Sequence, residues 1–283
     1  MANLQHETYM RFPGGLEKAF TLSYDEGIAS DKRFIKVIDS YNVKCTFNLN
    51  SGLFSEQPVR HNRMNEEESY LTFKDCHHEL GLHGHKHLFM TKVSASQCAQ
   101  EIVANREYLE AKYKRIVNGM AYPYGATSDS ICDMLRLLGV HYGRTTESTG
   151  TFDIPKDFYR WHPTCHHTDA NLFDIVDNFV DTAPHDESKS REPYLFMVWG
   201  HTYDFDREDN WNVLDELLNL VAGRKDVWYA TNGEIYEYVS AFNNLEWGIT
   251  DQLVYNPSAL DVWVERDKKL YRIPRGKTIA FAN

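Results

Sequence analysis

Apolar, β-rich runs alternate with amphipathic helical patterns through most of the chain. Residues 18–24 (KAFTLSY) predict a strand, and residues 30–41 predict a helix, because apolar side chains recur on one helical face after the N-cap residue Ser30. The same alternation predicts further strands at 43–49, 79–83, 117–123, 140–144, 194–200 and 226–231, and helices at 94–113, 128–138, 170–181 and 210–222. This order of elements favours a parallel sheet, either closed into a barrel or open and doubly wound.

The pattern changes after an amphipathic helix predicted at 233–244. Short alternating runs such as QLVYN, LDVWVER and KLYRI are separated by the turn-forming segments NPS, DKK and PRGK, which is typical of small antiparallel strands. We therefore predict a main α/β domain over residues 1–246 and a small C-terminal β appendage over residues 247–283.

Composition narrows the class of protein. The 283 residues suit one large α/β domain with a small addition. A net charge of −11 disfavours nucleic acid and anionic membranes as partners, because neither would gain counterion-release energy. An apolar signal-peptide core and an apolar run of membrane-spanning length are both missing, so a cytoplasmic protein is predicted if residue 1 is the natural start. The five cysteines form no C-x-x-C pair, which is typical of reduced thiols.

Side chains that can bind a metal ion or transfer protons follow four of the predicted strands, in the segments YDEG, HGHKH, YPYG and WGH. Loops after the carboxyl ends of parallel strands open onto one face, so we expect these side chains to share one site. The residues are Asp25, Glu26, His83, His87, Tyr124 and His201.

The two histidines His83 and His87 stand four residues apart, which puts both imidazoles on one face of a helical turn. Two imidazoles and one carboxylate form the His₂-carboxylate site of hydrolytic metal centres. A divalent ion lowers the pKa of water from about 16 toward about 7, and a second carboxylate can then take the proton. Asp25 or Glu26 could be that base, and His201 is a candidate general acid.

In motif order and spacing, residues 18 to 242 resemble the NodB-homology polysaccharide deacetylases, which form carbohydrate esterase family 4. The family's T-F-D-D-G motif corresponds to SYDEG, and the resemblance implies that Asp25 is the catalytic base and Glu26 a metal ligand. The H-[ST]-x-x-H motif corresponds to HGHKH, which implies His83 and His87 as the other two ligands.

The later motifs match less closely. The family's R-x-P-[YF]-G motif corresponds to AYPYG, which implies that the Tyr124 backbone N–H binds the oxyanion. The segment VWGH loosely matches the late Leu-His motif and implies His201 as the acid. The resemblance further implies a distorted (β/α)₇ barrel and a divalent metal cofactor, with Zn²⁺ the expected ion.

Two positions depart from the family pattern. Glu26 stands where the family has aspartate, which lengthens the ligand by one methylene. Ala121 stands where the family has the arginine that pairs with the catalytic aspartate. Arg144 and Arg160 are two cations that could replace it.

A cluster at 159–169, YRWHPTCHHTD, lies where the family often has an aromatic wall. Trp161 is predicted to line the substrate groove, and His162 to contact substrate. The histidines of this segment, which include His166 and His167, could instead bind a second ion or be structural.

The predicted function is that of a metal-dependent hydrolase that removes an acetyl group from a sugar or oligosaccharide. Two alternatives stay open. The chain could hydrolyse a non-peptide C–N bond in a small metabolite, or it could be a carbohydrate-binding protein whose catalytic site is impaired. The sequence indicates no oligomeric state.

Overall fold

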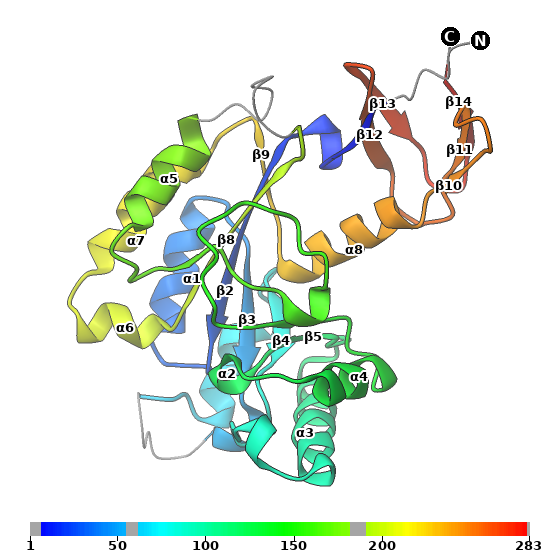
Figure 1. The fold of residues 1–283 in the computed structure, drawn as a ribbon. Coiled ribbons are helices and arrows are strands. Elements are labelled where there is room, and N and C mark those ends of the chain that lie inside the picture. The colour runs from blue at the N-terminus through cyan, green and yellow to red at the C-terminus, as the bar shows by residue number, and fades with distance from the viewer. Residues whose placement is uncertain (1–6, 55–61, 182–190, 282–283) are drawn as a thin grey trace.

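The computed structural model describes residues 7–54, 62–181 and 191–281. Its centre is a parallel sheet in the order β6-β5-β4-β3-β2-β8-β7, in which β9 pairs with the first residues of β2 (Figure 1). The strands are β2 (Lys18–Asp25), β3 (Cys45–Leu49), β4 (Glu79–Leu82), β5 (Gly119–Ala121), β6 (Tyr142–Arg144), β7 (Cys165–His166), β8 (Tyr194–Gly200) and β9 (Val227–Tyr229). The prediction of a distorted (β/α)₇ barrel with a β appendage is confirmed.

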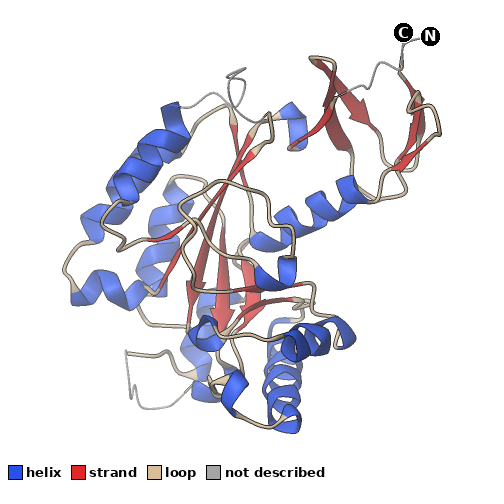
Figure 2. Cartoon of the chain, in the orientation of Figure 1, coloured by secondary structure: helices blue, strands red, loops and turns tan. Residues whose placement is uncertain are grey.

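Helices pack on the outside of this curved sheet (Figure 2). They are α1 (Asp31–Ser40), α2 (Glu66–Phe73), α3 (Ala95–Tyr113), α4 (Asp129–Leu137), α5 (Leu172–Asp181), α6 (Thr202–Arg207), α7 (Trp211–Val221) and α8 (Asn232–Asn243). Helix α3 begins at a capping box, in which Ser94 and Gln97 each satisfy a backbone N–H of the other. None of the helices in the described part of the chain is long and apolar enough to cross a bilayer.

Strand β2 shows how the fold prepares the site. All eight of its residues are buried, and they alternate between two faces. Phe20, Leu22 and Tyr24 belong to the large cluster that packs against the outer helices. The opposite face carries Ser23 and, at the carboxyl end of the strand, Asp25. A buried carboxylate is thereby held at the end of the central strand, on the inner face of the sheet.

The C-terminal segment forms two small antiparallel sheets. The strands are β10 (Glu246–Trp247), β11 (Leu253–Tyr255) and β14 (Thr278–Ala280) in one sheet, and β12 (Val262–Arg266), β13 (Lys269–Ile273) and the N-terminal β1 (Thr8–Arg11) in the other. Strand β1 pairs with β12, so the start of the chain lies with the appendage. The carboxyl ends of β2 and β3 point away from it (Figure 1). The division at residue 246 stays a prediction.

Candidate metal centre and catalytic cleft

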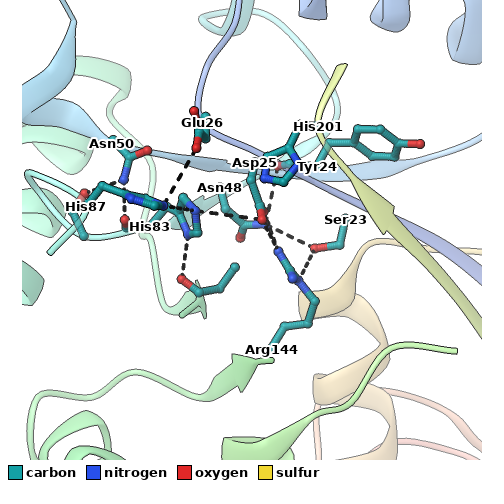
Figure 3. A network of polar contacts seen from close by, with 12 residues as sticks. Ser23, Tyr24, Asp25, Glu26, Asn48, Asn50, His83, His87, Arg144 and His201 are labelled. Carbon is teal, nitrogen blue, oxygen red and sulfur yellow. Dashed lines mark hydrogen bonds and ion pairs between the residues drawn. The ribbon is translucent and has the colours of Figure 1, made fainter. Parts of the chain in front are cut away.

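The carboxyl ends of the strands surround a cleft of about 780 Å³. Its lining includes all six residues expected to meet there, namely Asp25, Glu26, His83, His87, Tyr124 and His201. They come from the ends of β2, β4, β5 and β8 or from the turns that follow these strands. Parallel strands direct their following loops to one edge of the sheet, and this is why residues far apart in the sequence meet (Figure 3).

The two imidazoles are arranged as ligands to one ion. His83 Nδ1 lies 2.8 Å from the backbone oxygen of Ala121. A carbonyl oxygen only accepts, so Nδ1 carries the hydrogen and the Nε2 of the neutral ring keeps its lone pair. That Nε2 is 3.1 Å from Nε2 of His87. Burial lowers the pKa of His83, and burial followed by the charge of His83 lowers the pKa of His87 to about 3, so both rings are neutral near pH 7.

Glu26 supplies the carboxylate of the group. Its Oε1 lies 3.8 Å from Nε2 of His87, and one donor atom each from Glu26, His83 and His87 fall within 4.8 Å of one another. Two neutral nitrogens and a carboxylate oxygen at this spacing fit a divalent transition metal ion of the zinc type. Glu26 has φ 88° and Gly27 has φ 73°, so the chain turns sharply directly after β2.

Arg63 holds Glu26 in place, a contact that the motifs did not indicate. Its Nη2 lies 2.5 Å from Oε2 of Glu26, and its Nη1 donates to the Glu26 backbone oxygen at 2.8 Å. A non-glycine residue with positive φ costs about 1–3 kcal/mol unless its surroundings support it. Arg63 stabilises this backbone conformation of Glu26. The segment around Arg63 matches none of the sequence motifs, so its role could not be read from the sequence.

We expect Glu26→Gln to weaken metal binding substantially and Glu26→Asp to have an intermediate effect. The first substitution removes the anionic charge, whereas the second keeps the charge but shortens the reach. Metal affinity is to be measured by titration against a competing chelator. Glu147→Gln is the matched control, since the Glu147 side chain is 77% exposed and Glu147 is not among the residues lining the cleft. Unchanged affinity in both Glu26 variants would remove Glu26 from the ligand set.

Asp25 is buried beside a buried cation. Arg144 Nη2 lies 2.5 Å from both carboxylate oxygens of Asp25, and Asn48 Nδ2 donates to Oδ1 at 2.9 Å. Burial alone would raise the pKa of Asp25, but the charge of Arg144, with smaller contributions from His83 and His201, lowers it to about 2. Asp25 is therefore a carboxylate throughout the physiological pH range.

The missing family arginine is replaced from the neighbouring strand. Ala121 on β5 is the register partner of Arg144 on β6, so the guanidinium reaches Asp25 from one strand further along the sheet. Arg160, the other cation considered, pairs with Asp129 and Asp157 instead. The departure at Ala121 thus leaves the aspartate with a cationic partner.

His201 follows β8 and faces the cleft from the other side. Its Nδ1 lies 3.3 Å from Oδ2 of Asp204, three residues later in α6. Burial lowers the pKa of His201, but the hydrogen bond to Asp204 and the negative charges of Asp25 and Glu26 outweigh this effect and raise it overall. The shift is toward the protonated form, which a general acid requires. Asp204 was not singled out from the sequence, although its i+3 spacing from His201 is a usable signal.

Tyr124 lies at the rim of the cleft with its side chain exposed and its backbone at φ 59°. Its ring stacks on Phe89 with a centroid distance of 5.0 Å and meets His87 edge-on at 4.6 Å. Trp161 and His162 line a different cavity of about 1010 Å³. Trp161 is 1% exposed and packs against Tyr142, so its contact with substrate stays a prediction, as does that of His162.

Part of the sequence and the fold are shared with known proteins. Residues 13–143 match the family model described as polysaccharide deacetylase. No curated protein matches the chain in sequence. The fold is shared with a Mycobacterium smegmatis protein described as a polysaccharide deacetylase, at a TM-score of 0.61 and 16% identity over 83% of this chain and 94% of that chain.

Two further solved structures share the fold. A family 4 carbohydrate esterase from Streptomyces lividans, in complex with acetate, has a TM-score of 0.50 at 13% identity, with 75% of this chain and 91% of that chain covered. Puue allantoinase has a TM-score of 0.56 at 11% identity, with 80% and 91% covered. At these identities the solved structures establish the fold alone.

Residues 13–143, a little under half of the chain, match the polysaccharide deacetylase family model, and the fold is shared with solved structures of that class. The prediction of a deacetylase-type hydrolase from the motifs agrees with this match. The ion at the site, the cytoplasmic location and the roles of the individual residues stay predictions.

Proposed function

We propose that this chain is a metal-dependent deacetylase that removes an acetyl group from a sugar or a short oligosaccharide. The observation that supports it best is the position of an ionised, buried Asp25 beside the donor group of Glu26, His83 and His87 in one cleft. A carboxylate adjacent to a ligand group with room for water is the arrangement that metal-assisted hydrolysis requires.

Glu26, His83 and His87 would hold the ion, and Zn²⁺ suits a site of two nitrogens and one carboxylate oxygen. A divalent ion bound there supplies a Lewis acid that polarises a carbonyl and acidifies water. The Ala121 carbonyl fixes the ring of His83, and Arg63 fixes the carboxylate of Glu26, so the donors are oriented before an ion arrives.

Asp25 takes the proton from the attacking water. Its Oδ2 lies 3.8 Å from Nε2 of His83, which places it next to the ligand group. A carboxylate with a pKa of about 2 is a weak base, so Asp25 holds the proton only briefly and releases it to solvent before the next turnover. Arg144 and Asn48 keep the carboxylate aimed into the cleft during this exchange.

His201 delivers a proton to the leaving nitrogen or oxygen. Its Nδ1 donates to Asp204, so the Nε2–H of the protonated ring is the one available to the substrate. The backbone N–H of Tyr124 is the proposed donor to the oxyanion. The stacked rings of Tyr124 and Phe89 offer an apolar face at the rim on which a sugar ring can pack.

The function is tested with a panel of acetylated substrates. Metal-loaded protein is incubated with N-acetylated and O-acetylated sugars, their short oligomers, and small linear and cyclic amides, and the released acid is measured. We expect acetate from the sugars, loss of activity with a chelator and recovery with Zn²⁺. Hydrolysis of small amides alone would favour the metabolite alternative. Sugar binding without hydrolysis would favour the impaired binding protein.

The ligand assignment has its own test. We expect His83→Ala or His87→Ala to abolish stoichiometric binding at this centre and to leave the fold largely intact, because each variant removes one of two imidazole donors. The loss is measured as bound metal per chain by elemental analysis after dialysis against a weak chelator. His162→Ala is the control, since His162 lines a different cavity and belongs to none of the candidate metal groups of the described residues. Unchanged metal content in the His83 and His87 variants would contradict the site.

A pH profile tests the role of His201. Asp204 raises the pKa of His201, so Asp204→Asn lowers that pKa and the acid form is lost at a lower pH. We expect the basic limb of the kcat profile to move to lower pH in Asp204→Asn when both metal-stripped proteins are loaded with a single equivalent of metal per chain. A basic limb that stays in place would mean that His201 is not the group that titrates there.

A further inference from the structure

A second group of potential metal ligands adjoins the cleft through His201, and its other members are not among the residues lining the cleft. It consists of His166 and His167 at the end of β7, His201 after β8, and Asp204 in α6. Strands β7 and β8 are parallel neighbours, with His166 in register with Trp199. Their ends therefore bring two consecutive histidines near Asp204 in α6. The proposed function uses only His201 and Asp204 of this group.

The three histidines of this group all approach one oxygen atom, Oδ2 of Asp204. Oδ2 of Asp204 lies 3.3 Å from Nδ1 of His201, 3.7 Å from Nε2 of His166 and 4.0 Å from Nε2 of His167. Only the first is a hydrogen-bond distance. Two donors held tetrahedrally at zinc bond lengths are about 3.4 Å apart. The spacing around Asp204 is thus closer to that of ligands around an ion than to that of a hydrogen-bonded network.

The other atoms of these side chains already have partners, which leaves the facing atoms available. Oδ1 of Asp204 pairs with Arg207 Nη2 at 2.8 Å. Nδ1 of His166 accepts from the Thr168 backbone N–H at 3.1 Å and lies 2.7 Å from the Thr168 hydroxyl. Nε2 of the neutral ring therefore carries the hydrogen, and ion binding at Nε2 requires this hydrogen to move to Nδ1, where the Thr168 hydroxyl can accept it. Nε2 of His166 faces Oδ2 of Asp204 at 3.7 Å.

An independent observation comes from His167. Its residue is 2% exposed, and its Nδ1 lies 3.2 Å from the Tyr24 hydroxyl. Its Nε2 is buried, has no hydrogen-bond partner in the described part of the chain, and points toward Asp204. Buried ring nitrogens without a partner are uncommon in folded proteins, because burial removes their water without replacing it. An ion beside Asp204 would supply the missing interaction.

We propose that His166, His201 and Asp204, with His167 within reach as a fourth donor, form a second site for a divalent transition metal ion such as Zn²⁺. The donors of the three principal ligands fall within 4.8 Å of one another, as do those of the first group, and they have the same chemistry of two imidazoles and one carboxylate. The site is separate from the first, because the two groups share no residue.

The second site has a consequence that rests on the proposed function. An ion bound to Nδ1 of His201 takes the place of the proton that this nitrogen donates to Asp204. His201 with an ion on one nitrogen is no longer an imidazolium and cannot deliver a proton from the other. Metal in excess of one equivalent is therefore inhibitory, and the two sites have opposite effects on turnover.

Metal titration of the full chain separates the sites without any substrate. Metal-stripped wild-type protein is expected to bind two equivalents of Zn²⁺ by chelator competition, and the double variant His83→Ala/His87→Ala one. Adding His166→Phe to the double variant should remove the remaining equivalent, because phenylalanine keeps the ring packed on Trp199 but has no donor. Adding His162→Ala instead should keep it, since His162 lies in a different cavity. Loading with Co²⁺ should give a visible absorption band in the double variant that His166→Phe abolishes.

Circular dichroism and thermal melting establish that each variant is folded, and Asp204→Asn in the double variant is a second route to the same loss. No Zn²⁺ bound by the folded double variant would overturn the proposal, and so would binding that survives both His166→Phe and Asp204→Asn. If wild type binds a second equivalent of Zn²⁺ but hydrolyses no substrate, the second metal site is supported and only the proposed function is contradicted. Inhibition by excess Zn²⁺ in wild type, relieved in the single variant His166→Phe, is the expected kinetic counterpart.

Discussion

Asp25→Asn is expected to lower kcat by about 10²–10⁴ while the protein keeps its metal ion. The substitution removes the group that accepts the proton of water but leaves Glu26, His83 and His87 in place. Turnover is measured as acetate release under saturating substrate, and bound metal by elemental analysis of the same preparation. Retention of full activity would reassign the base, with Glu26 as the first successor.

A second buried aspartate near the cleft provides the matched control. Asp31 is 1% exposed and accepts hydrogen bonds from Thr202 and from the Ile28 backbone N–H. Burial raises the pKa of Asp31 to about 7, so this carboxyl group is partly protonated near neutral pH and resembles an asparagine amide. We expect Asp31→Asn to change kcat by less than about tenfold, because the group does not face the substrate. A loss as large as that of Asp25→Asn would show that any buried charge near the cleft is critical.

Arg144→Ala is expected to lower the free energy of unfolding by about 3–5 kcal/mol, because it leaves the carboxylate of Asp25 buried without its cation. Arg144 lowers the pKa of Asp25 in the folded state, so the pair stabilises the fold above the unfolded pKa of 3.8, and the stabilisation is lost as the pH falls toward 2. The difference between wild type and variant should therefore shrink below about pH 4. Denaturant unfolding at several pH values measures it, and a difference independent of pH would contradict the pairing.

The register of β5 and β6 suggests a rescue of the same variant. Ala121 is the register partner of Arg144 on the neighbouring strand. The NodB-homology deacetylases, which this chain resembles, have their arginine at the position of Ala121. We expect Ala121→Arg in the Arg144→Ala background to recover part of the lost stability and of kcat, whereas Ala121→Met should recover neither. Rescue by methionine would indicate that filling the space left by the Arg144 side chain is sufficient, and would argue against a role of the positive charge.

The alternation of strands and helices was readable from the sequence because most elements are long enough to show their own period. Helix α3 keeps its capping box and ends at Tyr113, as predicted. Strands β1, β7 and β10 and helices α2 and α6 were not predicted. Each is eight residues or shorter, and β1 is defined by its pairing with β12 at the other end of the chain. Short elements of this kind take their conformation from a partner and not from their own pattern.

The convergence of the cleft residues could be predicted for a similar reason. Parallel strands direct the loops after them to one edge, so Asp25, His83 and His201 had to approach one another once their strand ends were recognised. The sequence did not distinguish between Arg144 and Arg160 as the partner of Asp25. That choice depends on which residue of β6 lies opposite Ala121, and register is a property of the paired strands.

The sequence by itself indicated most of the alternation of strands and helices, the resemblance to the deacetylase family and the candidate donor residues of the first metal group, because these follow from local periodicity and from motifs at strand ends. Only the tertiary structure decided that Arg63 holds Glu26, that Arg144 neutralises Asp25, and that Trp161 lines a separate cavity. The tertiary structure also places His166 and His167 near Oδ2 of Asp204. Contacts between side chains far apart in the sequence depend on strand register and on the depth of burial, and neither is encoded in the spacing of residues along a single segment.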